Sequence, residues 1–417
     1  MTENNINPVV PISFFDRPQV KKEMIDGVQM GMEPVSNQEI GIAGVYGTWG
    51  ESYNNQTLPA LVEQRLGGVL PDNERLNLAE LGFVNRHHVK GLSLEENLKL
   101  ELEVGARFLS AAVKACGWLP EEVQAVLLGV SAPLGLDFTE AIARRAGIPD
   151  SALKVTIHKA CDSSVSGLHL ALNPELMENK QLPFNIAELL KGKKVLVGGM
   201  EGLSRFVEPS KDSNALQLFG NAFGVIGLIP GQAMRFITGK AHEVFDVEGV
   251  LQVKMLYPHQ HNSPENLIDV SQSGEHSVRI AGMQYEPEDG SNIKMAGPMG
   301  MVKLFVRSGV QVVQAVYQSY QEKLKEMGES GRTIAVAVVH HANYKINRLK
   351  EKNLQKEGIS LPMPWLLSEF GNVSAASNMI ALLRKLPDLH PGDHVMLDGF
   401  GAGTYYDTFV VELGGKA

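Results

Sequence analysis

Cysteine is scarce in this chain, which has two cysteines, Cys116 and Cys161, among 417 residues. Secreted scaffolds stabilised by disulfides use a dense and even set of cysteines, and structural zinc sites need cysteine or histidine pairs at short spacing. Two cysteines far apart in the sequence meet neither requirement, so a reducing, cytoplasmic location is expected. Two histidine pairs, His87 with His88 and His259 with His261, could suggest a metal site. No third ligand lies at helical spacing from either pair, so we interpret these histidines as solvated and expect no metal.

Clustered positive charge and long apolar runs are also missing. The formal net charge is -9, and the lysines and arginines are scattered along the sequence. Nucleic-acid binding needs concentrated positive charge, so no nucleic-acid partner is expected. No run reaches the roughly 18 apolar residues needed to span a bilayer, and the start of the chain lacks the basic and apolar segments of a secretion signal. We therefore expect no membrane span.

The chain does have the apolar material for a large core, since 44% of its residues are hydrophobic and 20% are charged. Residues 1–38 are polar and weakly periodic, and are interpreted as an N-terminal extension. From Glu39 onward, continuous apolar segments alternate with amphipathic ones, which predicts an α/β fold with sheets covered on both faces. The order of elements in one half resembles that in the other, which divides the chain into 39–235 and 236–417. The expected strands are 40–46, 123–129, 155–160, 195–197, 225–229, 334–339, 395–397 and 408–413, and the expected helices are 93–115, 139–146, 162–171, 302–320 and 374–383.

Cys161 lies where an expected strand, 155–160, passes directly into an expected helix. The free N–H groups of a first helical turn and the positive end of the helix dipole both stabilise a thiolate, so we expect a lowered thiol pKa and a nucleophilic cysteine. The alternative is a buried, inert cysteine. Cys116 lies late in a helix among apolar residues and is interpreted as packing.

Two further segments place polar side chains at the ends of expected elements. His340, His341 and Asn343 follow the apolar strand 334–339, and the ends of buried strands are where the sites of α/β proteins collect. Asn372 opens the helix 374–383, where an ordinary N-cap is the alternative interpretation.

A glycine-rich turn, Gly399-Phe-Gly-Ala-Gly403, follows the strand 395–397. A strand rather than a helix comes after it, so it is not a dinucleotide-binding fingerprint. Such a turn is suited to presenting backbone N–H groups to a developing oxyanion.

Taken in order, these segments resemble the motifs of the β-ketoacyl-acyl-carrier-protein synthase III family of the thiolase superfamily. That family has a strand-end Ala-Cys, then His-Gln-Ala-Asn, then Gly-Asn-Thr-Ser-Ala-Ala-Ser, then Phe-Gly-Gly-Gly. The matching segments here are Ala160-Cys161, His340-His-Ala-Asn343, Gly371-Asn-Val-Ser-Ala-Ala-Ser377 and Phe400-Gly-Ala-Gly403. The resemblance implies a five-layered α-β-α-β-α fold made of two similar halves. It also implies a homodimer that pairs the edge strands next to the nucleophile, no cofactor, and a role in fatty-acid or polyketide biosynthesis.

The resemblance further implies a role for each matched residue. Cys161 would accept an acyl group from acyl-CoA or an acyl carrier protein as a thioester. His340 and Asn372 would bind the carbonyl oxygen of a second, malonyl-type thioester and stabilise the enolate formed by decarboxylation. The backbone N–H groups of Cys161 and Ala402 would form the oxyanion hole. His341, which stands where the family has glutamine, and Asn343 are expected to support these groups.

The chain departs from the family where coenzyme A is bound. The tryptophan of the family's early Trp-x-x-x-Arg-Thr-Gly is absent, and Glu80 replaces the arginine; Arg205 is the one arginine expected to contact the substrate. Two alternatives therefore stay open beside decarboxylative condensation. One is a different reaction on the same site, either head-to-head condensation of two acyl-CoA molecules or acyl transfer to an oxygen or nitrogen nucleophile. The other is a non-catalytic partner subunit of a thiolase-fold heterodimer.

Overall fold

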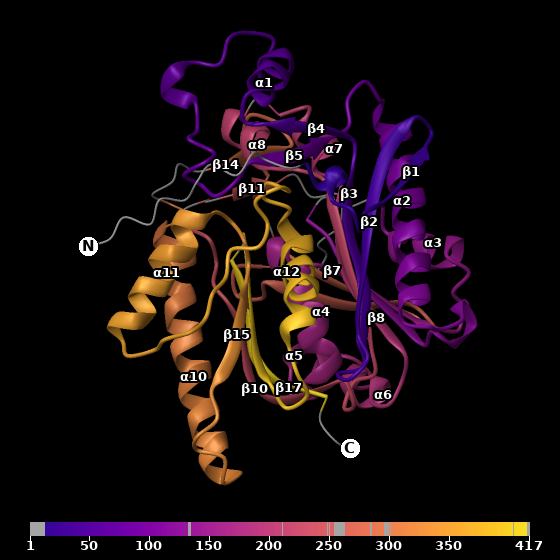
Figure 1. Cartoon of the computed structure of the whole chain (residues 1–417), viewed down its shortest axis with the longest axis vertical. Helices are drawn as coiled ribbons and strands as arrows, with labels where there is room; N and C mark the ends of the chain where they lie inside the picture. The colour runs from indigo at the N-terminus through magenta and orange to yellow at the C-terminus, as the bar shows by residue number, and fades with distance from the viewer. Residues whose placement is uncertain are drawn as a thin grey trace.

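The computed structural model describes residues 13–131, 135–210, 212–247, 249, 251–253, 263–283, 286–295, 300, 302–402 and 404–414. Two sheets dominate it, one of nine strands in the order β1-β2-β3-β9-β8-β6-β7-β13-β12 and one of four in the order β10-β17-β16-β15. Figure 1 shows the two sheets with helices α4 (Ser163–Leu172) and α12 (Ser377–Lys385) between them.

The remaining elements have the following bounds. The strands of the large sheet are β1 (Lys21–Ile25), β2 (Val28–Asn37), β3 (Ile42–Trp49), β6 (Ala125–Gly129), β7 (Leu153–His158), β8 (Val195–Glu201), β9 (Ala222–Leu228), β12 (Ile268–Gly274) and β13 (Ser277–Gly282). Those of the small sheet are β10 (Met234–Glu243), β15 (Ile334–Val339), β16 (His394–Gly401) and β17 (Tyr405–Leu413). Two strand pairs lie apart, β4 (Glu51–Asn54) with β5 (Asn85–His88) and β11 (Leu251–Val253) with β14 (Ile293–Met295). The other helices are α1 (Leu58–Leu66), α2 (Leu94–Ala115), α3 (Phe138–Arg145), α5 (Met177–Gln181), α6 (Ile186–Leu190), α7 (Leu203–Val207), α8 (Ser213–Leu218), α10 (Gly309–Glu326, after a π-helical turn at Val302–Ser308) and α11 (Tyr344–Lys356).

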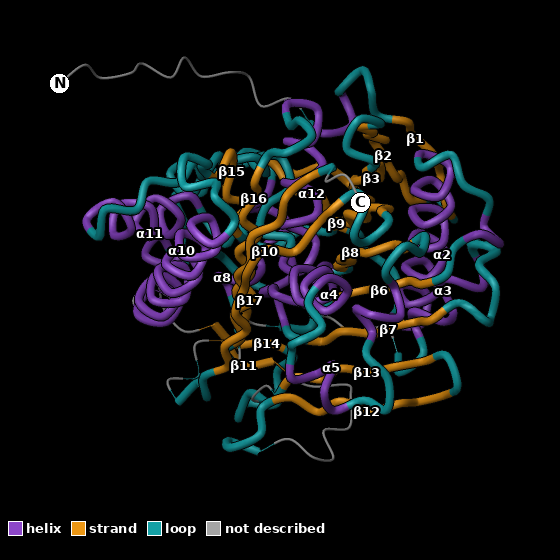
Figure 2. Tube along the Cα trace, turned by 90° about the horizontal axis from the view of Figure 1, so that it is seen from below, coloured by secondary structure: helices purple, strands orange, loops and turns teal. Residues whose placement is uncertain are grey.

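The layers follow the order helix, sheet, helix, sheet, helix. Helices α2 and α3 cover the outer face of the large sheet, α4 and α12 fill the space between the sheets, and α10 with α11 covers the outer face of the small one (Figure 2). Every residue of α4 is buried, because both of its faces pack against sheets. The predicted five-layered thiolase-like fold is therefore confirmed.

The two sheets repeat one topology. In the large sheet β3 is antiparallel to β9, β9 is antiparallel to β8, and β8 is parallel to β6. In the small sheet β10 is antiparallel to β17, β17 is antiparallel to β16, and β16 is parallel to β15. Each sheet contributes one central helix, α4 or α12, to the middle layer. The similar order of elements in the sequence thus reflects two similar halves in space.

Residues 21–37, part of the expected N-terminal extension, are strands of the large sheet. β1 and β2 form a hairpin whose second strand pairs with β3 over eight residue pairs, from Met30–Trp49 to Asn37–Ile42. β1 is exposed at four of its five positions, so it carries no apolar alternation that a sequence pattern could detect. The residues 1–12 of the extension lie outside the described part of the chain.

A second hairpin, β12–β13, comes from the second half of the sequence but joins the sheet of the first half. β13 runs parallel to β7 from Ser277–Lys154 to Ala281–His158. β7 leads to Cys161, so the strand next to the nucleophile is not an edge strand in this chain. The edge of β7 that the expected homodimer would use is paired with β13.

Candidate active site

Two similar turns lie at the starts of the two central helices. Each begins with a residue in the left-handed region, Ala160 at φ 50° and Ser374 at φ 44°, and continues through a 3-10 turn (Ala160–Asp162 or Ser374–Ala376) into α4 or α12. Non-glycine residues adopt this conformation at a cost, which is tolerated where the surrounding structure fixes it. The repeat therefore places Cys161 and the segment after Asn372 at equivalent, sharply turned positions between the sheets.

Cys161 is buried, and its sulfur lies 3.1 Å from the hydroxyl oxygen of Ser374 on the opposite turn. Burial is the main cause that raises the pKa of its thiol to about 12; nearby Glu201 and Asp162 act in the same direction, while the Ser374 hydroxyl acts in the opposite direction. The expected lowering of this pKa is therefore wrong. Desolvation and the adjacent carboxyl groups outweigh the N–H groups of the helix start.

His340 follows β15 and faces the start of α12. Its Nδ1 lies 2.6 Å from the hydroxyl oxygen of Ser377, and its ring packs edge-on against Phe400 with centroids 4.9 Å apart. Burial, with smaller contributions from His341 and Lys350, lowers the pKa of His340 to about 3, so the imidazole is neutral at physiological pH. The Ser377 hydroxyl also lies 3.2 Å from Asn378 Oδ1, a second acceptor for its single hydrogen. With that hydrogen directed at Nδ1 of His340, the imidazole proton lies on Nε2, which can then donate to a substrate oxygen.

The side chain of Asn372 is held at both ends. Its Oδ1 accepts the backbone N–H of Ser374 at 2.9 Å, and its Nδ2 donates to the carbonyl oxygen of Ala342 at 3.3 Å. The backbone N–H of Asn372 donates to Leu218 O at 2.8 Å. Asn372 is thus both the cap of the turn that carries Ser374 and a neighbour of the loop after His340. One amide hydrogen of Nδ2 is left for a further acceptor.

The end of β16 approaches the Cys161 turn closely enough to require glycine. A Cβ atom at Gly401 would lie 2.4 Å from Lys159 O and 3.1 Å from the backbone nitrogen of Cys161. A Cβ atom at Gly399 would lie 2.0 Å from a carboxyl oxygen of Asp162. The turn predicted to hold an oxyanion is therefore adjacent to Cys161, with Ala402 directly after Gly401; Gly403 lies outside the described residues.

His341 and Asn343 do not share the environment of His340. The Nε2 of His341 accepts the backbone N–H of Leu366 at 3.0 Å, and its ring packs on Trp365 with centroids 4.8 Å apart. Asn343 caps α11, since its Oδ1 accepts the backbone N–H of Ile346 at 2.9 Å. Both residues fix the loop after β15. Asn343 also lines a mostly apolar cavity of about 220 Å³, together with Leu76, Leu81, Asn214, Leu218, Met295, Val302, Lys345, Ile346 and Leu349.

Arg205, the expected substrate contact, lies in α7 and forms a buried bidentate ion pair. Its Nε and Nη2 donate to the two carboxylate oxygens of Glu101 at 2.9 and 3.1 Å. A cavity of about 560 Å³ adjoins it, lined also by Leu92, Leu94, Asn97, Phe206, Glu208, Pro209 and Asn292. The structure thus gives Arg205 a partner inside the protein, which the sequence did not predict.

Glu201 was missed by the sequence analysis. It ends β8, is fully buried, and its Oε1 accepts the Ser131 hydroxyl at 2.6 Å, the Ser131 backbone N–H at 2.8 Å and the Ala375 backbone N–H at 3.1 Å. The Ser131 hydroxyl also contacts that of Ser374. Burial raises the pKa of Glu201 to about 7 against the effect of these hydrogen bonds. The only sequence signal was an acidic residue ending an otherwise apolar strand.

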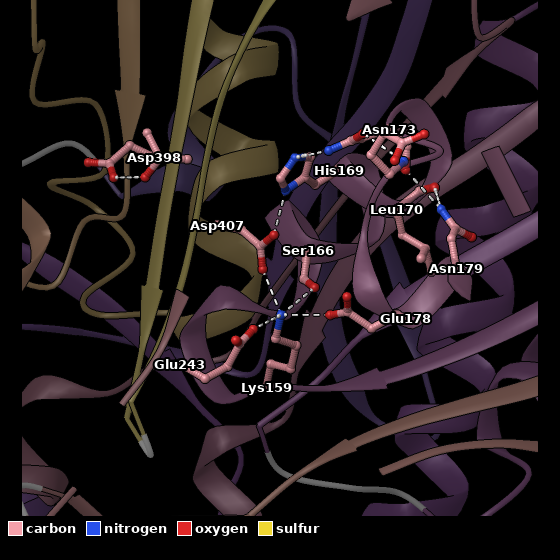
Figure 3. A network of polar contacts seen from close by, with 12 residues as sticks. Lys159, Ser166, His169, Leu170, Asn173, Glu178, Asn179, Glu243, Asp398 and Asp407 are labelled. Atoms are coloured by element: carbon pink, nitrogen blue, oxygen red, sulfur yellow. Dashed lines mark hydrogen bonds and ion pairs between the residues drawn. The ribbon is translucent and has the colours of Figure 1, made fainter. Parts of the chain in front are cut away.

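A buried ion network lies behind the Cys161 turn (Figure 3). Lys159 Nζ lies 2.7 Å from Asp407 Oδ2 on β17 and 3.3 Å from Glu178 Oε1, and Asp407 Oδ1 contacts His169 Nδ1 at 2.6 Å. Burial alone would lower the pKa of Lys159, but Asp407, Glu178 and Glu243 raise it well above 10.5. The charged lysine therefore ties the nucleophile turn of one sheet to a strand of the other.

The histidine pairs that the sequence suggested as solvated have different outcomes. His87 and His88 lie in β5 and are fully buried, and burial lowers the pKa of His87 to about 3. They are not solvated loop residues, because neighbouring elements cover them. The ring of Phe15 packs against His87 with centroids 4.6 Å apart, and the hydroxyl oxygen of Ser204 in α7 lies 3.3 Å from Nδ1 of His88. His259 and His261 lie outside the described residues. Among the residues that are described, no three candidate ligands gather as a metal site would require.

Comparison with known proteins gives one family match and several matches in fold. Residues 324–413 match the family described as 3-oxoacyl-[acyl-carrier-protein (ACP)] synthase III C terminal. No curated protein sequence matches the chain. No described helix is long and apolar enough to cross a membrane.

Solved structures share the fold over most of the chain. A 3-oxoacyl-[acyl-carrier-protein] synthase III from Aquifex aeolicus is 18% identical, with 89% of this chain and 98% of that chain covered and a TM-score of 0.61. AbyA1, a tetronic acid condensing enzyme, is 18% identical over 91% of this chain and 99% of that chain, with a TM-score of 0.60. OleA from Xanthomonas campestris, solved with bound lauric acid and lauroyl-CoA, is 12% identical over 89% of this chain and 98% of that chain, with a TM-score of 0.56. The expected resemblance to the synthase III family and its thiolase-like fold are confirmed.

Proposed function

We propose that this chain, a thiolase-fold protein resembling 3-oxoacyl-ACP synthase III, transfers an acyl group to Cys161 and then condenses it with a malonyl thioester. The observation that carries the proposal is the contact between the two central turns. Ser374 touches the sulfur of Cys161, and its backbone is held by Asn372, whose amide also contacts the loop after His340. A nucleophile and two neutral hydrogen-bond donors are thus linked within one buried site.

The first half-reaction needs only the nucleophile and an oxyanion hole. The sulfur of Cys161 attacks the thioester carbonyl, the carbon–sulfur bond to the carrier breaks, and the thiol proton passes to the leaving thiolate. The backbone N–H groups of Cys161 and Ala402 would stabilise the oxyanion between these steps.

In the second half-reaction the malonyl thioester loses carbon dioxide, and the bonding electrons become an enolate at the thioester. Neutral His340, through Nε2–H, and Asn372, through Nδ2–H, would donate to its oxygen. The enolate carbon then attacks the acyl carbonyl, the carbon–sulfur bond to Cys161 breaks, and the Cys161 thiolate takes up one proton from solvent to restore the thiol. His340 acts here as a neutral donor, because burial lowers its pKa to about 3 and keeps the imidazole unprotonated at Nδ1 or Nε2 near pH 7.

We propose acyl-CoA or acyl carrier protein as the donor and a cytoplasmic location. A homodimer that extended the large sheet would pair through one of its two terminal strands, β1 or β12, of which β12 lies on the β7 side. The altered coenzyme A motif supports one alternative on the same site, condensation of two acyl-CoA molecules, and OleA, which shares the fold, was solved with an acyl-CoA bound. The non-catalytic subunit is the weaker alternative, because the chain keeps Cys161, His340 and Asn372 together.

Intact-mass spectrometry tests the proposal. The purified protein is incubated with a panel of acyl-CoAs, and then with malonyl-CoA, beside Cys161→Ser as the control. We expect an acyl adduct on the wild type that malonyl-CoA removes as a β-ketoacyl product. Removal of the acyl adduct by a second acyl-CoA, without malonyl-CoA, would favour head-to-head condensation. If no acyl-CoA of the panel gives an adduct, the proposed enzymatic activity is contradicted.

A further inference from the structure

We propose that Glu201 receives the thiol proton of Cys161 through a relay of two serine hydroxyls. This inference rests on the proposed role of Cys161 as the nucleophile. Ser374 lies next to the sulfur, at 3.1 Å, and Ser131 lies next to the carboxylate, at 2.6 Å. The two hydroxyls contact each other, which closes an unbroken path from sulfur to carboxylate.

The site needs such an acceptor. With a pKa of about 12, the Cys161 thiol is neutral at physiological pH, and it is a poor nucleophile until its proton leaves. His340 is not suited to the task, since its Nδ1 is engaged with Ser377 and its pKa is about 3. Glu201, with a pKa near 7, is available as the carboxylate at neutral and higher pH.

The geometry lets the path carry a proton in either direction. Each serine hydroxyl can donate one hydrogen bond while it accepts another, so the two can point from sulfur to carboxylate before transfer and from carboxylate to sulfur after it. The backbone N–H groups of Ser131 and Ala375 hold Glu201 Oε1 in both states. Four buried side chains from three elements and one loop therefore form one connected unit.

The relay balances the first half-reaction. As the sulfur forms its bond to the acyl carbon, the thiol proton moves to Ser374, the Ser374 proton to Ser131, and the Ser131 proton to Glu201. When the carbon–sulfur bond of the donor thioester breaks, the path runs in reverse and delivers a proton to the leaving thiolate. No proton is gained or lost by the protein over the step.

Alkylation by iodoacetamide tests the relay without any acyl substrate. We compare the pH dependence of Cys161 alkylation in the wild type, Glu201→Gln and Ser131→Ala. Ser164→Ala is the matched control, because the Ser164 hydroxyl is buried three residues after Cys161 and makes no hydrogen bond to any described residue. Cys116, whose pKa burial also raises to about 12, reports unassisted reactivity within the same chain.

The relay predicts that Glu201→Gln and Ser131→Ala each slow Cys161 alkylation at pH 7.5 by at least about 100-fold, the usual contribution of a positioned base. Both should also lose the wild-type rise in rate centred near pH 7, the pKa of Glu201. A purely electrostatic role predicts the opposite sign, because the negative charge of Glu201 raises the thiol pKa and its removal would speed alkylation. Faster or unchanged alkylation in Glu201→Gln with an unchanged pH profile would overturn the proposal.

Ser131→Ala keeps the inference testable if Glu201→Gln does not fold, since Glu201 would retain both of its backbone partners. The relay and the proposed function can also fail separately. A Glu201-dependent pH profile in a protein that no acyl-CoA acylates would support the relay and contradict the enzyme. Acylation at the wild-type rate in both relay variants would contradict the relay and support the enzyme.

Discussion

Replacing Asn372 should separate two roles that the structure gives to one side chain. Its Oδ1 caps the turn at Ser374, and its Nδ2 is the proposed donor to the enolate oxygen. Loss of a cap costs about 1 kcal/mol of stability. Loss of one preorganised oxyanion donor costs about 3–4 kcal/mol in the transition state, or roughly 100-fold to 1000-fold in rate. The catalytic effect should therefore exceed the structural one clearly.

Two substitutions distinguish the roles. Asn372→Ala removes both the cap and the donor, and it also frees the backbone of Ser374, which touches the nucleophile. Asn372→Ser keeps a side-chain oxygen that can accept the N–H of Ser374 in a similar turn. We expect Asn372→Ser to form acyl-enzyme at close to the wild-type rate but to condense at least about 100-fold more slowly.

Single-turnover experiments measure the two steps apart, with acylation followed by mass and condensation by product release. Thermal unfolding of the same variants measures the cap. If Asn372→Ser condenses at the parental rate while Asn372→Ala does not, the side chain is only a cap. A transferase that never stabilises an enolate would then explain the site better.

Three further predictions follow from buried contacts. Ser377→Ala should leave acylation intact and slow condensation about fivefold, because His340 loses the hydrogen bond at Nδ1 that sets its tautomer, and one hydrogen bond contributes about 1 kcal/mol. Equal slowing of both steps would contradict this role. Lys159→Met should lower the free energy of unfolding by about 3–5 kcal/mol, because it leaves the buried Asp407 carboxylate without its partner, and adding Asp407→Asn should recover part of that loss. Denaturant unfolding measures both changes, and an unchanged midpoint for Lys159→Met would contradict a stabilising role of the ion network. The pKa of Glu201 is raised from 4.5 to about 7, so the folded protein binds the extra proton and stability falls as pH rises across that range. The fall is about 2.5 kcal/mol between pH 5 and 8 and should be absent in Glu201→Gln, which a pH series of unfolding curves would test.

The sequence by itself determined the features that depend on near neighbours. The capping box at the start of α2 forms between residues three apart: Ser93 accepts the backbone N–H of Glu96, and the Glu96 carboxylate accepts the backbone N–H of Ser93. Cys161 before a helix, His340 after a strand and Asn372 at a helix start were located in the same way, since each is defined by its own local element. The fold class followed because apolar periodicity records which faces are covered.

Only the tertiary structure decided what depends on distant partners. The hairpin β1–β2 joins the large sheet by pairing with β3, and the hairpin β12–β13 joins it by pairing with β7, which lies far earlier in the sequence. The sign of the Cys161 pKa shift was mistaken because helix starts are visible in a sequence, whereas desolvation and the approach of Glu201 are not. The relay joins Ser131 to Ser374 across 243 positions of sequence. The sequence around a serine does not show which distant hydroxyl it will contact. Ser131 and Ser374 meet only because the two sheets are packed together, so composition and spacing could not predict this contact.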